Sequence, residues 1–323
     1  AKYAPDGTVL WAKRAGKSYE NRASSVAVDA SGNCYLAGFV GGGDIFLTKY
    51  TPSGSVLWTS SPYGIDYDNA LSVAVDAFGN SYVAGEFYSP ILTFDTTALI
   101  IANGSVDAND MFLAKYATDG SVLWAKSAGG SERDAASSVA IDASGNCYVA
   151  GEFHSSSITL GSTTLTNTDN SGNTNDIFLA KYASDGTVLW ARSANGTAWE
   201  GASSVAVDIS GNCYVAGYFY GSSITFGSTS LTNTGSGDIF LAKYTPDGSV
   251  LWAKSAGGMD YDKVLSVAVD SSGNCYMAGY FKSSSITFGF DTFTNAGNYD
   301  MFFTKYAPNG LVLWAKSVGG TDR

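Results

Sequence analysis

The chain has 323 residues, a formal net charge of −11, only 15% charged residues, 38 glycines and a single histidine. The acidic balance argues against nucleic acid or an anionic membrane surface as a partner, and no apolar run is long enough to insert into a bilayer. The lone His154 excludes a multi-histidine metal site and a histidine-based catalytic relay.

One unit of four short segments recurs through the chain with a period of roughly 60 residues. In chain order the unit reads S-V-A-V-D, Y-V-A-G, I-F-L-A-K-Y and V-L-W-A-K, with small variations and with a glycine turn after the first and third segments. β-Branched and aromatic residues favour strands, and glycine suits turns that need a positive φ. We therefore predict four antiparallel strands per unit, named A to D in this order.

The units also predict the domain organisation. Residues 1–23 encode a surplus C–D hairpin, and five full units follow at about 24–70, 71–136, 137–202, 203–264 and 265–323. Four-stranded antiparallel units repeated radially are typical of a β-propeller, so we predict one all-β domain with a ring of five or six wedges. A parallel β-helix is the alternative, but its rungs are much shorter. Longer B–C loops in the last four units predict a small extra hairpin in each.

Two consecutive runs characterise the unit: D-I-F-L-A-K-Y-x-x-D-G-S-V-L-W-A-K-S-A-G-G and then S-S-V-A-V-D-A-S-G-N-C-Y-V-A-G. On these runs the chain resembles the SBBP repeat, a β-propeller repeat found in many bacterial secreted and surface proteins. The resemblance covers essentially the whole chain. It implies a propeller fold and an extracellular or cell-surface location, and it transfers no catalytic residue.

Several recurring residues have a structural interpretation. Cys34, Cys147, Cys213 and Cys275 share one position of the unit, so they lie in different blades and are expected to stay free of disulfides. The tryptophans of the outer strands are expected to pack between adjacent blades, with a sugar-binding or partner-binding stripe as the alternative. The strand-C lysines are expected to pair with aspartates of strand A or strand C.

Acidic residues in the loops from strand D to strand A form a second group. In a propeller these loops lie beside the central channel, so the residues could form a cation- or ligand-binding ring, with Ca²⁺ as the possible ion. The candidates are Glu20, Asp66, Asp68, Glu132, Asp134, Glu200, Asp260 and Asp262. Solvated loops are the interpretation that we favour, and the ring is the alternative. Several equivalent acidic pairs do not single out one acid and one base, so we do not expect a glycosidase or any other enzyme.

The surplus hairpin is the feature with the clearest functional implication. Residues 1–17 and 304–320 closely match, and both encode a C–D hairpin. The hairpin could belong to a piece of a longer array, form a partial sixth wedge, or add to the exposed sheet edge of another subunit. The candidate assembly residues are Tyr3, Val9, Leu10, Trp11, Tyr306, Leu313 and Trp314.

These features favour a non-catalytic, extracellular structural or adhesive propeller that self-assembles through the hairpin, with filaments as one form that this assembly could take. A module that binds glycans or cations is the alternative, and a polysaccharide-degrading enzyme is the third reading. The expected partners are further copies of the chain, other surface proteins or glycans. Apart from possible Ca²⁺, no cofactor is expected.

Overall fold

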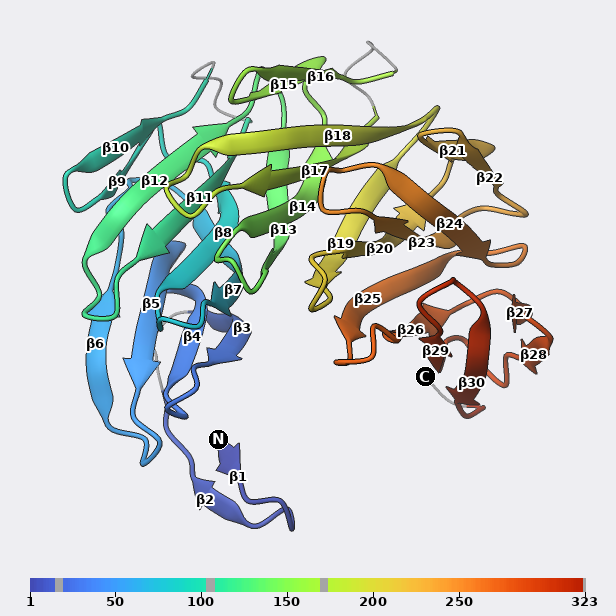
Figure 1. The fold of residues 1–323 in the computed structure, drawn as a ribbon, viewed down its shortest axis with the longest axis horizontal. Coiled ribbons are helices and arrows are strands. Elements are labelled where there is room, and N and C mark those ends of the chain that lie inside the picture. The colour runs from blue at the N-terminus through green and yellow to red at the C-terminus, as the bar shows by residue number, and fades with distance from the viewer. Residues whose placement is uncertain (15–19, 103–107, 169–173, 322–323) are drawn as a thin grey trace.

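The computed structural model describes residues 1–14, 20–102, 108–168 and 174–321, and within these ranges every regular element is a β-strand (Figure 1). No helix of membrane-spanning length and apolarity occurs in this part of the chain. Four four-stranded antiparallel sheets, and four strands of a six-stranded one, are named blades 1 to 5 in chain order and are arranged in an arc (Figure 1). The repeated antiparallel units are those of a propeller-like fold, as predicted.

Each blade uses its four main strands in the predicted order A, B, C and D. Blade 1 comprises β3 (Asn21–Val28), β4 (Cys34–Val40), β5 (Asp44–Tyr50) and β6 (Val56–Ser60). Blade 2 comprises β7 (Asp68–Val75), β8 (Ser81–Phe87), β11 (Asp110–Tyr116) and β12 (Val122–Ala128). Blade 3 comprises β13 (Asp134–Ile141), β14 (Cys147–Phe153), β17 (Asp176–Tyr182) and β18 (Val188–Gly196).

The last two blades repeat the pattern. Blade 4 comprises β19 (Glu200–Val207), β20 (Cys213–Phe219), β23 (Asp238–Tyr244) and β24 (Val250–Ala256). Blade 5 comprises β25 (Asp262–Val269), β26 (Cys275–Phe281), β29 (Asp300–Tyr306) and β30 (Val312–Val318). Strand A is innermost, and successive A strands pack against one another from β3 to β25.

Small hairpins occupy the long B–C loops, as predicted. They are β9 (Ile91–Phe94) with β10 (Thr97–Ile100), β15 (Ser157–Leu160) with β16 (Thr163–Thr166), β21 (Ser223–Phe226) with β22 (Thr229–Thr232), and β27 (Ser285–Phe288) with β28 (Asp291–Thr294). The surplus hairpin is β1 (Lys2–Tyr3) with β2 (Val9–Trp11). Residues 15–19 of the predicted 1–23 segment lie outside the described residues.

The blades begin three residues earlier than predicted, at Asn21, Asp68, Asp134, Glu200 and Asp262. The reason is a β-bulge in strand A. In blade 3 the register shifts between Ala136 and Ser138, and the residues before the bulge continue the pairing as far as Asp134 opposite Phe153. The prediction recognised the repeated S-V-A-V-D core and missed this extension, whose side chains differ between units.

The turn between strands A and B follows from the Asp and Gly-Asn positions of the repeat. In blade 1 Asp29 Oδ1 accepts the backbone N–H groups of Ser31 and Asn33 at 3.0 and 2.9 Å, and Oδ2 accepts the Asn33 amide at 2.8 Å. Gly32 has φ +78°, which a residue with a side chain rarely adopts. The turn is therefore set locally by three residues of the unit.

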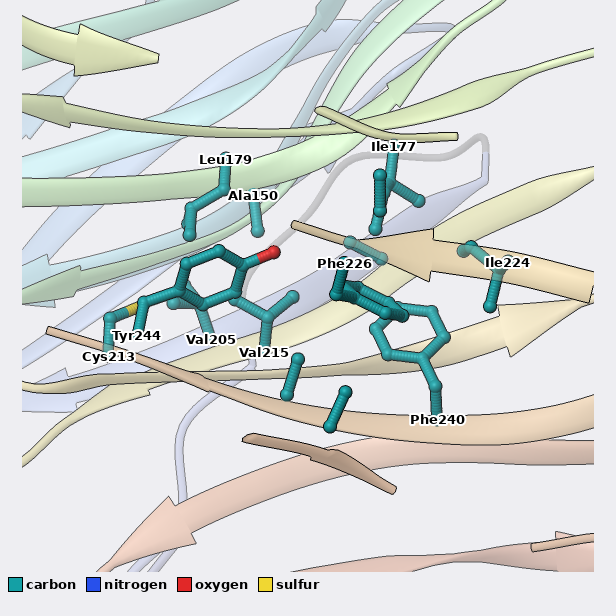
Figure 2. Packing of buried hydrophobic residues seen from close by; sticks show 14 of the residues in the cluster. Ala150, Ile177, Leu179, Val205, Cys213, Val215, Ile224, Phe226, Phe240 and Tyr244 are labelled. Carbon is teal, nitrogen blue, oxygen red and sulfur yellow. The ribbon is translucent and has the colours of Figure 1, made fainter. Parts of the chain in front are cut away.

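The hydrophobic core is divided among the blade junctions. In Figure 2, Ala150, Ile177 and Leu179 of blade 3 face Val205, Val215 and Tyr244 of blade 4. Equivalent buried clusters lie between blades 1 and 2, 2 and 3, and 4 and 5. Burying one large apolar side chain contributes about 1.5–3 kcal/mol, so each blade depends on its neighbours for much of its stability.

Candidate assembly surface at the ends of the arc

Each junction between neighbouring blades carries the same tryptophan contact. The indole N–H of the strand-D tryptophan donates to a backbone carbonyl in the C–D turn of the next blade. The pairs are Trp58 to Thr118 at 2.9 Å, Trp124 to Ser184 at 3.1 Å, Trp190 to Pro246 at 3.0 Å and Trp252 to Pro308 at 3.1 Å. The predicted packing of tryptophan between blades is confirmed at these junctions.

A glycine in the same turn makes room for each indole. Gly120, for example, has φ +91°, and a Cβ there would lie 2.8 Å from the Trp58 ring. The equivalent contacts are Gly186 with Trp124, Gly248 with Trp190 and Gly310 with Trp252. The turn thus forms a seat that combines a carbonyl acceptor with a glycine under the ring.

The strand-C lysines strengthen the same junctions. Lys181 donates to the Pro246 carbonyl at 3.3 Å, pairs with Asp142 at 3.4 Å, and lies over the Tyr148 ring at 4.7 Å. Equivalent ion pairs join Lys49 to Asp29, Lys243 to Asp208 and Lys305 to Asp270. The expected pairing is therefore found in four blades, and the partner is the strand-A aspartate.

The surplus hairpin makes these junction contacts on blade 1. Trp11 donates its indole N–H to the Pro52 carbonyl at 2.9 Å, and Lys2 donates to the same oxygen at 3.3 Å. Gly54 lies under the Trp11 ring. The hairpin β1–β2 therefore occupies the position of the outer half of a further blade that would precede blade 1.

The opposite end of the arc carries the complementary half of the contact. Trp314 on β30 touches the rings of Tyr276 and Phe303, but within the described ranges its indole N–H has no hydrogen-bond partner. Gly7, in the turn of the surplus hairpin, has φ +84° like the other turn glycines, yet nothing described lies within 4 Å of its Cβ position. Trp314 therefore has no C–D turn of a following blade to bind, and the Gly7 turn has no tryptophan of a preceding blade packed on it.

Apolar side chains are exposed at both ends although their counterparts are buried inside the arc. On blade 1, Val26 is 63% exposed, whereas its counterpart Val205 is 5% exposed. On blade 5, Met301 is 60% and Phe303 45% exposed. Their counterparts Ile239 and Leu241 in blade 4 are each 1% exposed. The face of blade 5 is thus a blade-junction surface that no described residue covers, whereas the hairpin covers part of the blade 1 face through Trp11 and leaves Val26 exposed.

The predicted assembly residues fall into different environments. Trp11 and Trp314 belong to the junction contact described above, and Tyr3 is 60% exposed while Tyr306 is buried. Leu10 and Leu313 are exposed, but so are the equivalent residues of the interior blades, such as Leu123 and Leu251. Val9 is 53% exposed, whereas its interior counterparts Val122, Val188 and Val250 are half-buried. Tyr3, Val9 and Trp314 therefore differ from their interior counterparts, and Trp11 does not.

The predicted acidic residues fall into two environments. Asp68, Asp134, Glu200 and Asp262 are buried, and three of them accept a hydrogen bond from a serine hydroxyl of their own blade: Ser89, Ser155 and Ser283, respectively. Glu20, Asp66 and Glu132 are exposed, and Asp260 is half-buried. Asp260 pairs with Lys282 at 3.1 Å. No group of three or more His, Cys, Asp or Glu side chains suited to a metal ion occurs among the described residues.

The four cysteines are free thiols, as predicted, and Cys147, Cys213 and Cys275 are buried. The single histidine, His154, is half-buried, with its ring centroid 5.1 Å from that of Trp199. Burial lowers the pKa of His154, with Arg133 as a second cause.

The prediction missed a set of non-repeated residues on one face of the arc. They follow strand B or precede strand A, where the units differ most: Tyr67, Tyr88, Arg133, His154, Trp199, Tyr220, Tyr261 and Lys282. The available signal was this variability within an otherwise uniform repeat. We call these residues the rim.

One of the known proteins that the chain resembles is named as a repeat protein. No family model matches the chain. The chain is similar to the uncharacterized WD repeat-containing protein L264 of Acanthamoeba polyphaga mimivirus, at 25% identity over 98% of this chain and 23% of that protein. It is also similar to the regulatory protein FlaEY of Caulobacter vibrioides, at 27% identity over 51% of this chain and 17% of that protein. The chain thus spans less than a quarter of either relative.

Solved structures are similar over most of the chain at low sequence identity. A protein of unknown function from Bacteroides caccae has a TM-score of 0.46 and 12% identity, covering 92% of this chain and 82% of its own. Sqt1 from Chaetomium thermophilum has a TM-score of 0.34 and 10% identity, covering 95% and 85%. The WD-repeat relative fits a propeller-like repeat protein.

Proposed function

We propose that the chain is a non-catalytic structural or adhesive propeller protein of the cell exterior that self-associates head to tail. The observation that carries this proposal is the unmatched pair formed by Trp314 and the Gly7 turn. In the proposed contact, the blade 5 face of one molecule packs against β1–β2 of a second copy. The resemblance to the SBBP repeat supports the extracellular location.

A second copy fits the open face of blade 5 because it presents the missing seat. The indole of Trp314 would donate to the Pro5 carbonyl of the second copy, which holds the position that Pro52 holds for Trp11. Lys305 would reach the same oxygen, as Lys2 reaches the Pro52 carbonyl within blade 1. These are the contacts of an interior junction, so neither partner needs a new kind of interaction.

An apolar contact accompanies the tryptophan seat. Blade 5 has a hollow of about 440 Å³ lined by Leu265, Tyr280, Met301, Phe303 and Val318. Inside the arc, Tyr182 packs in the same buried cluster as Leu113 of the preceding blade. Tyr3 and Phe303 are the counterparts of these two residues, so the exposed Tyr3 of a second copy would cover Phe303.

The contact is heterologous, because the two surfaces that meet are different. A heterologous contact leaves one free surface of each kind after every addition, so it produces an open filament unless the rotation closes a ring. Within each molecule, β1–β2 would then be the outer half of a sixth wedge.

Light scattering after size-exclusion chromatography tests the proposal. The wild-type chain is expected to show a mass that rises with concentration, and Trp314→Ala is expected to elute as a monomer. Leu313→Ala is the matched control, because Leu313 is exposed on the same strand and has exposed counterparts in the interior blades. A wild-type monomer at all concentrations, or equal masses for wild type and Trp314→Ala, would contradict the proposal.

A further inference from the structure

The rim is organised by backbone hydrogen bonds that recur in four blades. The residue after strand B donates its N–H to the carbonyl of the residue before strand A in the same blade. The pairs are Tyr88 to Tyr67 at 3.1 Å, His154 to Arg133 at 2.8 Å, Tyr220 to Trp199 at 3.0 Å and Lys282 to Tyr261 at 3.1 Å. Rings also meet across blade boundaries, as with Tyr220 and Tyr261 at 5.3 Å. The rim side chains are therefore held side by side on a fixed frame.

A cavity of about 320 Å³ opens between blades 2, 3 and 4 within this rim. Cavities of a few hundred Å³ with a few convergent polar groups are typical of small-molecule sites. The principal lining residues are Glu86, Tyr88, Asn109, Arg133, Glu152 and Trp199. Trp199 is 47% exposed, and its ring is held edge-to-face against His154.

The floor of the cavity carries two carboxylates in equivalent positions. Glu86 and Glu152 stand where blades 1, 4 and 5 have Phe39, Tyr218 and Tyr280. An aromatic residue can therefore occupy this position in the fold, and the carboxylates of blades 2 and 3 are not required by the repeat. They are a local departure from it.

Each carboxylate is fixed by a buried asparagine. Asn109 Nδ2 donates to Glu86 Oε2 at 2.8 Å and to the Asp134 carbonyl at 3.0 Å. Asn175 Nδ2 donates to Glu152 Oε2 at 2.9 Å and to the Glu200 carbonyl at 2.7 Å. The Tyr218 hydroxyl donates a second hydrogen bond to Glu152, at 3.2 Å. The positions of both carboxylates are thus defined by protein donors.

The carboxamide oxygen of Asn109 is buried and has no hydrogen-bond partner among the described residues. Asn109 is 1% exposed and lines the cavity. A buried acceptor without a donor costs about 1–3 kcal/mol, so the cavity favours a ligand that brings O–H or N–H donors. The oxygens of Glu86 and Glu152 are further acceptors for the same ligand.

The charges around the cavity oppose one another. Burial raises the pKa of both Glu86 and Glu152, and the charges of Arg133 and Lys263, respectively, act in the opposite direction. Arg133 at the cavity edge disfavours a cationic ligand, and the two carboxylates disfavour an anionic one. An uncharged ligand with many hydroxyl groups is repelled neither by Arg133 nor by the two carboxylates.

We propose that this cavity binds a neutral saccharide. The apolar face of one sugar ring packs on Trp199, and its hydroxyl groups donate to Glu86, Glu152 and the carboxamide oxygen of Asn109. Arg133 donates to a ring or hydroxyl oxygen of the same sugar. The site lies on the blade 2–4 face and does not use the ends of the arc, so it is independent of the proposed self-association.

The experiment combines calorimetry with ¹⁹F NMR of the full chain labelled with 5-fluorotryptophan. The probes are neutral hexasaccharides of glucose, mannose, xylose and N-acetylglucosamine, with choline and inorganic phosphate as charged comparisons. The Trp199→Phe variant assigns the Trp199 resonance. We expect at least one neutral hexasaccharide to release heat and shift that resonance, and neither charged probe to do so.

Variants connect the binding to the cavity. Trp199→Ala and Glu152→Gln are expected to weaken binding at least about tenfold, which corresponds to 1.4 kcal/mol. Tyr299→Ala, which removes an exposed aromatic side chain outside the cavity, is the matched control with unchanged affinity. Thermal unfolding verifies that each variant is folded.

Three results would overturn the proposal: no response to any neutral hexasaccharide up to about 10 mM, binding that is unchanged in both cavity variants, or binding of choline or phosphate alone. The recovered hexasaccharides are also analysed for chain length. Hexasaccharides recovered at full length support a site that only binds. Recovery of shorter saccharides would mean that the site hydrolyses them.

Discussion

The indole of Trp11 and the carbonyl of Pro52 form a hydrogen bond of 2.9 Å between the surplus hairpin and blade 1 of the same molecule. The bond has the form of the interior contact between Trp190 and Pro246, at 3.0 Å. The hairpin is therefore a docked half-blade in the structure. Its free side, at Gly7, faces away from the contact that holds it.

Replacing Trp11 should affect the hairpin, whereas replacing Trp190 should affect the whole arc. Trp190→Ala removes a buried ring at an interior junction, and such substitutions cost about 3–5 kcal/mol. We expect its thermal midpoint to fall by several degrees. Trp11→Ala should leave the midpoint nearly unchanged and speed amide hydrogen exchange in residues 2–11. Equal drops in the two midpoints would show that the hairpin is part of the cooperative core.

The open face of blade 5 offers a matched pair of substitutions. Met301 is 60% exposed, whereas its counterpart Met111 in blade 2 is 1% exposed. Met301→Glu should keep the native circular dichroism spectrum and thermal midpoint but abolish self-association. Met111→Glu buries a charge and should unfold the protein or lower the midpoint steeply. Self-association that survives Met301→Glu would exclude this face as the contact surface.

Neighbouring acids in one loop should differ sharply in their effect on stability. Asp134 is buried and accepts the Ser155 hydroxyl at 2.6 Å and the Gly130 N–H at 2.9 Å, so Asp134→Ala leaves both donors unpaired. Each unpaired buried donor costs about 1–3 kcal/mol. Glu132→Ala, at an exposed site, should change the midpoint little. Similar effects of the two variants, measured by thermal unfolding, would contradict the structural role of Asp134.

The pH dependence of stability should reveal the buried Glu200. Burial, with the nearby Asp176 charge, raises its pKa to about 9 from 4.5. A carboxyl with a raised native pKa holds its proton more tightly when folded, so the stability of the wild type falls as pH rises from 4.5 toward 9. The glutamine of Glu200→Gln cannot ionise, so the variant does not lose this stability. The thermal midpoint of the variant, relative to that of the wild type, should therefore rise as pH rises from 5 to 9.

Glu132→Gln, at an exposed site, is the control for the amide substitution itself. A midpoint difference between Glu200→Gln and the wild type that stays constant with pH would mean that the native pKa of Glu200 is not raised.

The repeat made much of the fold predictable because each unit encodes its own hairpins and turns. The Asp29–Asn33 turn and the junction role of Trp124 follow from residues that recur in every unit or nearly so. The burial of Asp134 next to the exposed Glu132 did not follow, because it depends on the bulge that extends strand A. The proximity of His154 and Trp199 could not be predicted from the sequence either, since it arises only when blades 3 and 4 pack together.

The docking of the surplus hairpin was one of several open alternatives in the sequence. The match between residues 1–17 and 304–320 identifies a C–D hairpin but not the blade against which it packs. Tertiary structure adds the complementary pair of Trp314 and Gly7, which lie at opposite ends of the chain. Such a pairing depends on the curvature of the arc, which strand propensities do not specify.

The most direct test of head-to-tail association mixes two variants that each lose one end of the contact. Trp314→Ala removes the tryptophan, and Gly7→Asn keeps the positive φ that asparagine tolerates while filling the seat. Each variant alone should be monomeric by light scattering, and an equimolar mixture should form dimers that grow no further, because one intact Trp314 meets one intact Gly7 turn. A mixture that stays monomeric, or that grows beyond the dimer, would contradict the proposed contact.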